Sequence, residues 1–140
     1  MNQLDSVYSR FLSLISDYVY LELTKEELAS ELATKLEIAL SKLTKFEPVE
    51  FVLDDEMNGT FSRVLTSTEI TILAQAILVE WLSMRVYNVR QMENHLSSKD
   101  FNAFSNANHL KEMMNLQKHA EEQRDYLMKQ YTLSRMLGGN

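Results

Sequence analysis

The 140-residue chain contains no cysteine, a single proline and only three glycines. Without cysteine it can form no disulfide framework, no thiolate zinc site and no cysteine nucleophile. An all-β fold needs a turn every few residues, and turns depend largely on glycine and proline, so their scarcity argues against such a fold. The length is sufficient for one domain with a substantial hydrophobic core.

Motifs for catalysis and cofactor binding are missing as well. With Gly59, Gly138 and Gly139 as the only glycines, the chain has no glycine-rich phosphate loop and no G-x-S-x-G nucleophile elbow. No two of the three histidines stand at the i, i+4 spacing that places two imidazoles on one helix face. We therefore expect no enzymatic activity, no cofactor and no bound metal.

One acidic stretch begins like a calcium-binding loop. Asp54, Glu56 and Asn58 stand at its first, third and fifth positions, and Gly59 stands at the sixth. The twelfth position of such a loop requires a bidentate glutamate, and here it is Leu65. We interpret the stretch as an acidic turn, and a metal-dependent enzyme that uses these acids is the weakest alternative function.

The net charge of −6 is unevenly distributed along the chain. Residues 1–60 hold 5 basic and 12 acidic residues, which gives −7, and residues 61–140 hold 9 and 8, which gives +1. A chain with this balance lacks the basic footprint of proteins that grip nucleic acid. An acidic surface would suit a protein that lets DNA pass without binding it, but an acidic face more often serves only solubility.

Neither the N-terminus nor the most apolar segment predicts contact with a membrane. The N-terminus lacks the basic region and the apolar core of a secretory signal. The most apolar window, residues 70–89, contains Gln75, Glu80 and Arg85. Because charged residues are rare inside true membrane spans, this window predicts a buried helix.

The spacing of apolar residues predicts an all-α protomer, a single domain over residues 1–140 that resembles a four-helix bundle. The first helix should cover residues 5–17. The second should begin at the capping box formed by Thr24 and Glu27 and continue to about Lys45.

Residues 47–65 are the least helical stretch of the chain. Pro48 disfavours a helical conformation in the residue before it, and Asn58-Gly59 favours a tight turn. Apolar residues alternate with polar ones ahead of this turn. We therefore expect a short irregular or hairpin insertion between the second and third helices.

The third and fourth helices should both be long. Thr66 and Glu69 form a second capping box, and the helix over residues 67–95 is apolar on most sides, which predicts a buried central helix. The C-terminal helix over residues 106–136 would be more than about 45 Å long at the usual rise per residue. A compact domain of this size has a radius of gyration of only about 14 Å, so part of that helix should protrude.

The connection between these helices, SSKDFNAFSNANHLKE, is polar and yet contains Phe101 and Phe104. An active-site loop would need a nucleophile with its base, or a set of metal ligands, and the connection has neither. We interpret it as an anchored joint, in which Phe101 or Phe104 packs on the bundle and Ser105 caps the last helix.

The end of the last helix is unusually apolar for a chain terminus. Tyr131, Leu133, Met136 and Leu137 fall within seven residues. We expect residues 131–140 to lie beyond the cover of the bundle, to end flexibly, and to be removable without unfolding the protein. Uncovered apolar groups of this kind mark a partner site, so these four residues are the predicted partner-binding residues.

A set of helical residues and one joint, spread over residues 65–131, is similar to a known family. The set comprises Leu65-Thr66, Glu69-Ile70, Ile72-Leu73-Ala74, Glu80-Trp81-Leu82, Ser98, Asp100-Phe101, Ser105, His109-Leu110 and Tyr131. With these residues the chain resembles the small head-tail connector proteins of tailed bacteriophages, also called neck or adaptor proteins. The resemblance does not extend to residues 1–60.

The resemblance implies a structural virion protein that is made in the host cytoplasm and incorporated at the head-tail interface. Helical protomers of such proteins form a ring, commonly twelvefold, beneath the portal vertex. The C-terminal segment would reach the portal protein, and a tail, stopper or head-completion protein would dock on the ring. The ring would extend the channel through which DNA passes without sequence-specific binding.

A function of a different class is also compatible with the residues. A cytoplasmic helical regulator or chaperone would bind one partner through the methionine-rich last helix, where Met113 and Met114 offer adaptable side chains. The two functions differ in where the protein is found. A connector is present in purified virions at ring stoichiometry, and a regulator is absent from them.

Overall fold

The computed structural model describes residues 3–15, 24–53, 59–95 and 107–138. Within these ranges the chain forms four α-helices and one two-stranded sheet. The elements are α1 (Gln3–Leu12), α2 (Lys25–Lys42), β1 (Phe51–Leu53), β2 (Gly59–Phe61), α3 (Ser67–His95) and α5 (Ala107–Met136). The predicted all-α fold, with its long central helix, its long C-terminal helix and a short hairpin insertion, is confirmed.

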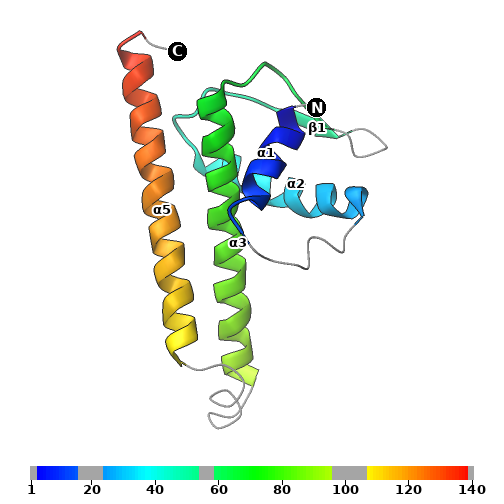
Figure 1. Cartoon of the computed structure of the whole chain (residues 1–140), viewed down its shortest axis with the longest axis vertical. Helices are drawn as coiled ribbons and strands as arrows, with labels where there is room; N and C mark the ends of the chain where they lie inside the picture. The colour runs from blue at the N-terminus through cyan, green and yellow to red at the C-terminus, as the bar shows by residue number, and fades with distance from the viewer. Residues whose placement is uncertain (1–2, 16–23, 54–58, 96–106, 139–140) are drawn as a thin grey trace.

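Helix α3 is the centre of the molecule and packs against α1, α2 and α5. Figure 1 shows α5 running antiparallel beside α3, while α1 and α2 lie on the other side of α3. The two long helices are joined by hydrogen bonds from Gln75 Nε2 to the Ala120 carbonyl (3.1 Å) and from Gln117 Nε2 to Ser83 Oγ (2.8 Å). The end of the α3–α5 pair that lies lowest in Figure 1 extends well past α1 and α2.

The core surrounds the N-terminal half of α3, which explains why that helix is apolar on most sides. Its largest fully buried side chains are Leu4, Val7 and Phe11 of α1, Leu32 and Leu36 of α2, and Ile72, Leu73, Ile77 and Val79 of α3. Each of these helices therefore buries one face against α3, and the burial supplies most of the stabilisation of the fold.

Residues Ser67–Asn88 of α3 are long and apolar enough to cross a membrane by length and composition alone. More than half of that stretch is buried inside the protein. The apolar side chains of this stretch therefore belong largely to the core, as is usual for the central helix of a bundle.

Both predicted capping boxes are confirmed. At α2, the Glu27 amide donates to Thr24 Oγ1 (3.1 Å) and the Thr24 amide donates to Glu27 Oε1 (3.3 Å). At α3, the Glu69 amide donates to Thr66 Oγ1 (3.1 Å) and the Thr66 amide donates to Glu69 Oε1 (2.9 Å). Each box satisfies amide groups that a helix N-terminus would otherwise leave unpaired.

Two helices end earlier than the sequence predicts. Helix α1 ends at Leu12, five residues before the predicted end, and the Leu14 amide turns back to the Phe11 carbonyl (2.9 Å). Helix α2 ends at Lys42, three residues early, and the Leu43 amide bonds the Leu40 carbonyl (3.2 Å). In both cases a tighter three-residue turn closes the helix, which hydrophobic spacing alone does not reveal.

The insertion contains the predicted hairpin, with a longer connection than expected. Strands β1 and β2 pair antiparallel, with Phe51 opposite Phe61 and Leu53 opposite Gly59. Because Gly59 pairs within the strand, the connection covers residues 54–58 and is no two-residue turn at positions 58 and 59. The acidic stretch considered as a metal loop falls mainly on those residues, which lie outside the described ranges.

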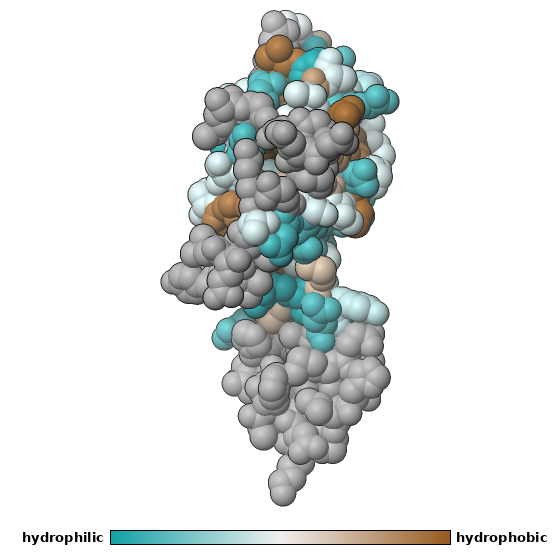
Figure 2. All heavy atoms as spheres, turned by 90° about the vertical axis from the view of Figure 1, so that its right-hand side faces the viewer, coloured by the Kyte–Doolittle hydropathy of each residue, from teal (hydrophilic) through white to brown (hydrophobic). Residues whose placement is uncertain are grey.

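The side of the molecule on which α1 and α2 lie has a mixed surface. In its coloured part, apolar residues appear as small spots separated by polar ones (Figure 2). Isolated exposed apolar residues of this kind are ordinary for a soluble surface and need no partner to explain them.

Tyr8 yields a test of the core. Its hydroxyl is buried and has no hydrogen-bond partner among the described residues, and burial raises the pKa of that hydroxyl. A buried polar group left unpaired costs about 1–3 kcal/mol. We therefore expect Tyr8→Phe to keep or raise the free energy of unfolding, by up to about 2 kcal/mol in urea denaturation.

The exposed Tyr126 supplies the matched control, since Tyr126→Phe removes a hydroxyl that water already satisfies. A clear loss of stability in Tyr8→Phe alone would mean that the Tyr8 hydroxyl has a partner outside the described residues.

Candidate functional site

Three of the four predicted partner-binding residues lie at the surface, at the C-terminal end of α5. Leu133, Met136 and Leu137 are 49%, 78% and 79% exposed. Met136 is the last residue of the helix, and Gly138 follows with a φ of 79°, the left-handed conformation that commonly ends helices. These three residues are called the terminal apolar group below.

Tyr131, the fourth predicted residue, is only 8% exposed and belongs to the core. Its ring stacks on Phe46 with the ring centroids 5.4 Å apart. The expectation that the bundle leaves Tyr131 uncovered is wrong, because the antiparallel α5 stays beside α3 as far as the first turn of that helix. Removal of residues 131–140 would therefore take away a core residue, and the uncovered segment begins only at Leu133.

Tyr131 reaches the buried carboxylate of Glu69, which is 2% exposed. Oxygen Oε1 of Glu69 accepts hydrogen bonds from Arg63 Nη1 (2.9 Å) and from the Thr66 amide (2.9 Å). Oxygen Oε2 accepts from Arg63 Nη2 (2.6 Å) and from the Tyr131 hydroxyl (2.9 Å). Each oxygen therefore has two donors, as a buried carboxylate requires.

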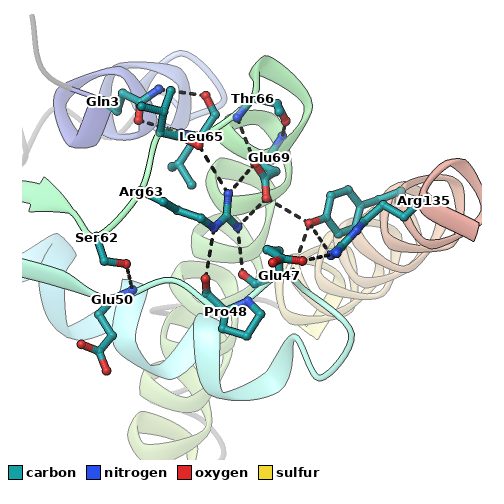
Figure 3. Close-up of polar contacts among 12 residues, drawn as sticks. Gln3, Glu47, Pro48, Glu50, Ser62, Arg63, Leu65, Thr66, Glu69 and Arg135 are labelled. Atoms are coloured by element: carbon teal, nitrogen blue, oxygen red, sulfur yellow. Dashed lines mark hydrogen bonds and ion pairs between the residues drawn. The ribbon is translucent and has the colours of Figure 1, made fainter. Parts of the chain in front are cut away.

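Arg63 connects this carboxylate to the segment before β1. Its Nε donates to the Pro48 carbonyl (3.1 Å) and its Nη2 donates to the Glu47 carbonyl (2.9 Å), while the other side of the guanidinium faces Glu69 (Figure 3). The planar, forked guanidinium makes these contacts together, which a lysine could not do. Arg63 thus fixes the insertion against the start of α3.

Arg135 and Glu47 contact the Tyr131 hydroxyl and each other. The Tyr131 hydroxyl accepts from the Glu47 amide (3.2 Å) and from Arg135 Nη1 (3.3 Å), and Arg135 also forms an ion pair with the Glu47 carboxylate. Glu47, Arg63, Glu69, Tyr131 and Arg135 form one connected set, called the Glu69 network below. Figure 3 labels Glu47, Arg63, Glu69 and Arg135 of this set. It joins α5, α3 and the insertion at one point.

The network determines the protonation state of Glu69. Burial alone would raise the pKa of this carboxyl, but hydrogen bonds from Arg63, the Thr66 amide and Tyr131 outweigh it and lower the pKa from 4.5 to about 2. The hydrogen bonding between Arg63 and Glu69 also raises the pKa of the Arg63 guanidinium. Glu69 stays ionised at neutral pH with both oxygens occupied, so the arrangement suits structural support rather than proton transfer.

Grooves flank the C-terminal end of α5 on two sides. One, of about 630 Å³, lies beside the Glu69 network and is lined by Glu47, Arg63 and Arg135 among others. The second, of about 450 Å³, lies between the end of α2 and α5, and Leu133 and Met136 belong to its lining. The terminal apolar group therefore borders a hollow surface.

A third groove, of about 450 Å³, lies farther along α3, and Trp81 is one of the residues that line it. Trp81 is half-buried, with the Phe11 ring edge-on at 6.5 Å between centroids and the Arg85 guanidinium 4.8 Å from its ring centroid. The indole is thus engaged on two sides by the protein itself.

Within the described ranges, no group of three or more His, Asp or Glu side chains could hold a metal ion. The proposed joint anchors Phe101, Phe104 and Ser105 lie outside the described ranges. Nothing in the structure therefore tests their role.

Sequence reasoning identified Glu69 only as a capping residue and missed Glu47, Arg63 and Arg135. The one available signal is the position of Glu69 itself. It stands one helical turn from Leu65, Ile72 and Leu73 at the start of a helix that is buried on most sides, and a carboxylate there needs a cationic partner.

Comparison of the chain with protein-family models, with curated proteins and with solved structures finds no match in any of the three. The function therefore has to be argued from the residues and geometry of the chain itself.

Tyr131→Phe tests the network. The variant keeps the ring that stacks on Phe46 and removes the hydroxyl that donates to Glu69 and accepts from the Glu47 amide and Arg135. Because a hydrogen bond to a buried charge contributes about 1.5–3 kcal/mol, we expect a loss of about 2 kcal/mol in free energy of unfolding. Amide exchange in the last three turns of α5 should accelerate, and exchange in α1 should change only with global stability. Equal stability of variant and parent would remove Tyr131 from the network.

The depressed pKa of Glu69 predicts a loss of stability in acid. The carboxyl has a pKa of about 2 when folded and 4.5 in the reference state, so its contribution is complete above pH 4.5 and disappears as the pH falls towards 2. A shift of this size corresponds to about 3 kcal/mol.

Glu69→Gln, which imitates the protonated carboxyl, isolates this contribution. The difference in free energy of unfolding between parent and variant should be about 3 kcal/mol at pH 6 and should shrink towards zero near pH 2. A difference that does not vary with pH over this interval would show that the charge of Glu69 contributes nothing.

Proposed function

We propose that this chain is a structural subunit of the neck of a tailed bacteriophage, a head-tail adaptor that attaches to the portal protein through the C-terminal end of α5. The observation that carries the proposal is the terminal apolar group. Leu133, Met136 and Leu137 are between about half and four-fifths exposed at the end of a helix whose preceding turn is fixed by the Glu69 network.

Rigid presentation distinguishes this end from an ordinary chain terminus. Tyr131 and Arg135 are bound within the Glu69 network; they stand two residues before and after Leu133, and Arg135 directly precedes Met136. A helix end held in this way loses little conformational entropy when it docks, so more of the gain from burying the apolar side chains remains as affinity. Apolar groups that are both exposed and held in place are typical of a partner site.

The resemblance of residues 65–131 to head-tail connectors supplies the identity of the partner. In the proposed neck, copies of the chain form a ring, commonly twelvefold in that family, with the portal protein on one side. A tail, stopper or head-completion protein docks on the other side. DNA passes through the channel without sequence-specific contact, in agreement with the acidic balance of the chain.

The alternative function, a cytoplasmic regulator that binds through a methionine-rich helix, receives less support. Met113, one of the two methionines on which it depends, is buried in the structure, which leaves Met114, 40% exposed, as the other. Counting copies of the chain in purified virions separates the two functions, because a regulator would be absent from them.

The triple variant Leu133→Ser, Met136→Ser, Leu137→Ser tests the portal contact. All three side chains are exposed, so the variant should fold with unchanged thermal stability. Binding to portal-bearing, DNA-filled heads, measured by cosedimentation, should fall more than about tenfold, because apolar anchors dominate such contacts.

Val52→Ser with Val64→Ser is the matched control, since both valines are exposed and belong to the insertion, not to the terminal apolar group. The control should bind heads as the parent does. If the triple variant sedimented with heads at the parental ratio, the portal contact would lie elsewhere on the chain and the assignment of this end would be wrong.

A further inference from the structure

The groove between the end of α2 and α5 has a charge opposite to that of the chain as a whole. Its lining includes four basic residues, Lys42, Lys45, Arg124 and Lys129, and one acidic residue, Asp125. The chain carries a net charge of −6, and its first sixty residues account for −7. The groove is therefore a local cationic site on an acidic protein.

Two of the four basic residues form an ion pair within the described ranges, and two do not. Lys42 forms an ion pair with the buried Glu80, and Arg124 contacts Asp125 at 3.2 Å. In the described part of the chain, Lys45 and Lys129 are exposed and take part in no ion pair. They stand on different elements, Lys45 after α2 and Lys129 on α5, and both line the same groove.

A simpler explanation, attraction to the end of a helix, accounts for only two of the four basic residues. Cations near the C-terminus of a helix are favourable because they offset the partial negative charge of its last carbonyl groups. This accounts for Lys42 and Lys45 at the end of α2. It does not account for Arg124 and Lys129, which stand in the interior of α5.

The remaining lining of the groove is largely apolar. Leu43 is buried, Met128 is half-buried, and Leu133 and Met136 are exposed. An apolar surface flanked by lysines matches a segment that is apolar on one face and acidic on the other. Methionine side chains adapt to irregular apolar partners, and both methionines here are available on the groove side.

We propose that this groove binds an acidic amphipathic segment of a partner protein, with its apolar face on Leu133 and Met136 and its carboxylates on Lys45 and Lys129. The inference rests on the proposed function where it takes that partner to be the portal protein, because both share Leu133 and Met136. The binding mode is that of a helix in a groove, in which apolar residues spaced i, i+3, i+4 and i+7 supply the anchors.

Nucleic acid fits the same groove poorly. Sites for single-stranded nucleic acid combine a basic track with aromatic side chains on which bases stack. Among the described residues, none that lines this groove is aromatic. An acidic amphipathic segment would match the charge of the groove and would also cover its exposed apolar residues, which a phosphate backbone would leave in contact with water.

Two synthetic peptides test the proposal on the full-length chain. Both carry leucines at i, i+3, i+4 and i+7, and the remaining positions are glutamate in one peptide and lysine in the other. Fluorescence anisotropy should show that the acidic peptide binds at least about tenfold more tightly than the basic one, with an affinity that falls as salt is raised.

The variant Lys45→Glu, Lys129→Glu should weaken binding of the acidic peptide at least about tenfold. Lys111→Glu with Lys118→Glu is the matched control, because it makes the same charge change at exposed positions of α5 outside the groove. Equal binding of both peptides, equal loss in the control variant, or tighter binding of an oligothymidylate probe than of the acidic peptide would each overturn the proposal.

Cosedimentation with heads keeps this inference separate from the proposed function. If the acidic peptide competes with heads for the chain, the groove is the portal contact. If the peptide binds the groove as predicted and the parent chain does not bind heads, the portal assignment fails and the groove proposal stands. Self-association that the acidic peptide inhibits, and that Lys45→Glu with Lys129→Glu abolishes, would identify a second copy as occupant and overturn the assignment to a different partner.

Discussion

The buried carboxylate of Glu69 is the constraint on which the arrangement of the long helices depends. A charge removed from water is tolerated only when donors surround it, and here they come from the insertion, from the start of α3 and from α5. A slide of α5 by one turn would withdraw the Tyr131 hydroxyl from Glu69 and the Glu47 amide together. The network therefore fixes the register of α5 against α3, which apolar packing alone specifies less sharply.

That register explains where the excess length of the last helix lies. From its length, α5 was expected to protrude at its C-terminal end. The structure places Tyr131 opposite the first turn of α3 and pairs Gln117 with Ser83, so the long helices lie side by side over most of their length. Helices α1 and α2 cover only one part of α3, and the greater protrusion is the other end of the α3–α5 pair (Figure 1). A length argument that compares one helix with the average size of a domain does not say whether a second long helix lies beside it.

The features that the sequence predicted well are those encoded by neighbouring residues. The capping boxes at Thr24 and Thr66 depend on residues three positions apart, and the predicted bounds 67–95 agree with α3 at both ends. The Glu69 network depends on residues that are distant in sequence. Its members Glu47 and Tyr131 are 84 positions apart, and the apolar character of Tyr131 predicted an exposed anchor where the fold uses a buried hydroxyl. Pattern reasoning thus correctly predicted that Leu133, Met136 and Leu137 are exposed, and it missed the polar contacts that hold this end of the helix.

The Glu69 network and the groove between α2 and α5 are connected, because α5 contributes residues to both. Tyr131 and Arg135, four residues apart, share the face that meets the Glu69 network, while Lys129, Leu133 and Met136 line the groove on another face. A segment bound in the groove would contact α2 and α5 at once and so favour the register that the network requires. By linkage, the free energy by which a bound segment would stabilise the network equals the free energy by which the network would favour binding of that segment. A buried carboxylate with no reactive role of its own would in this way contribute to the affinity of a contact that it never touches.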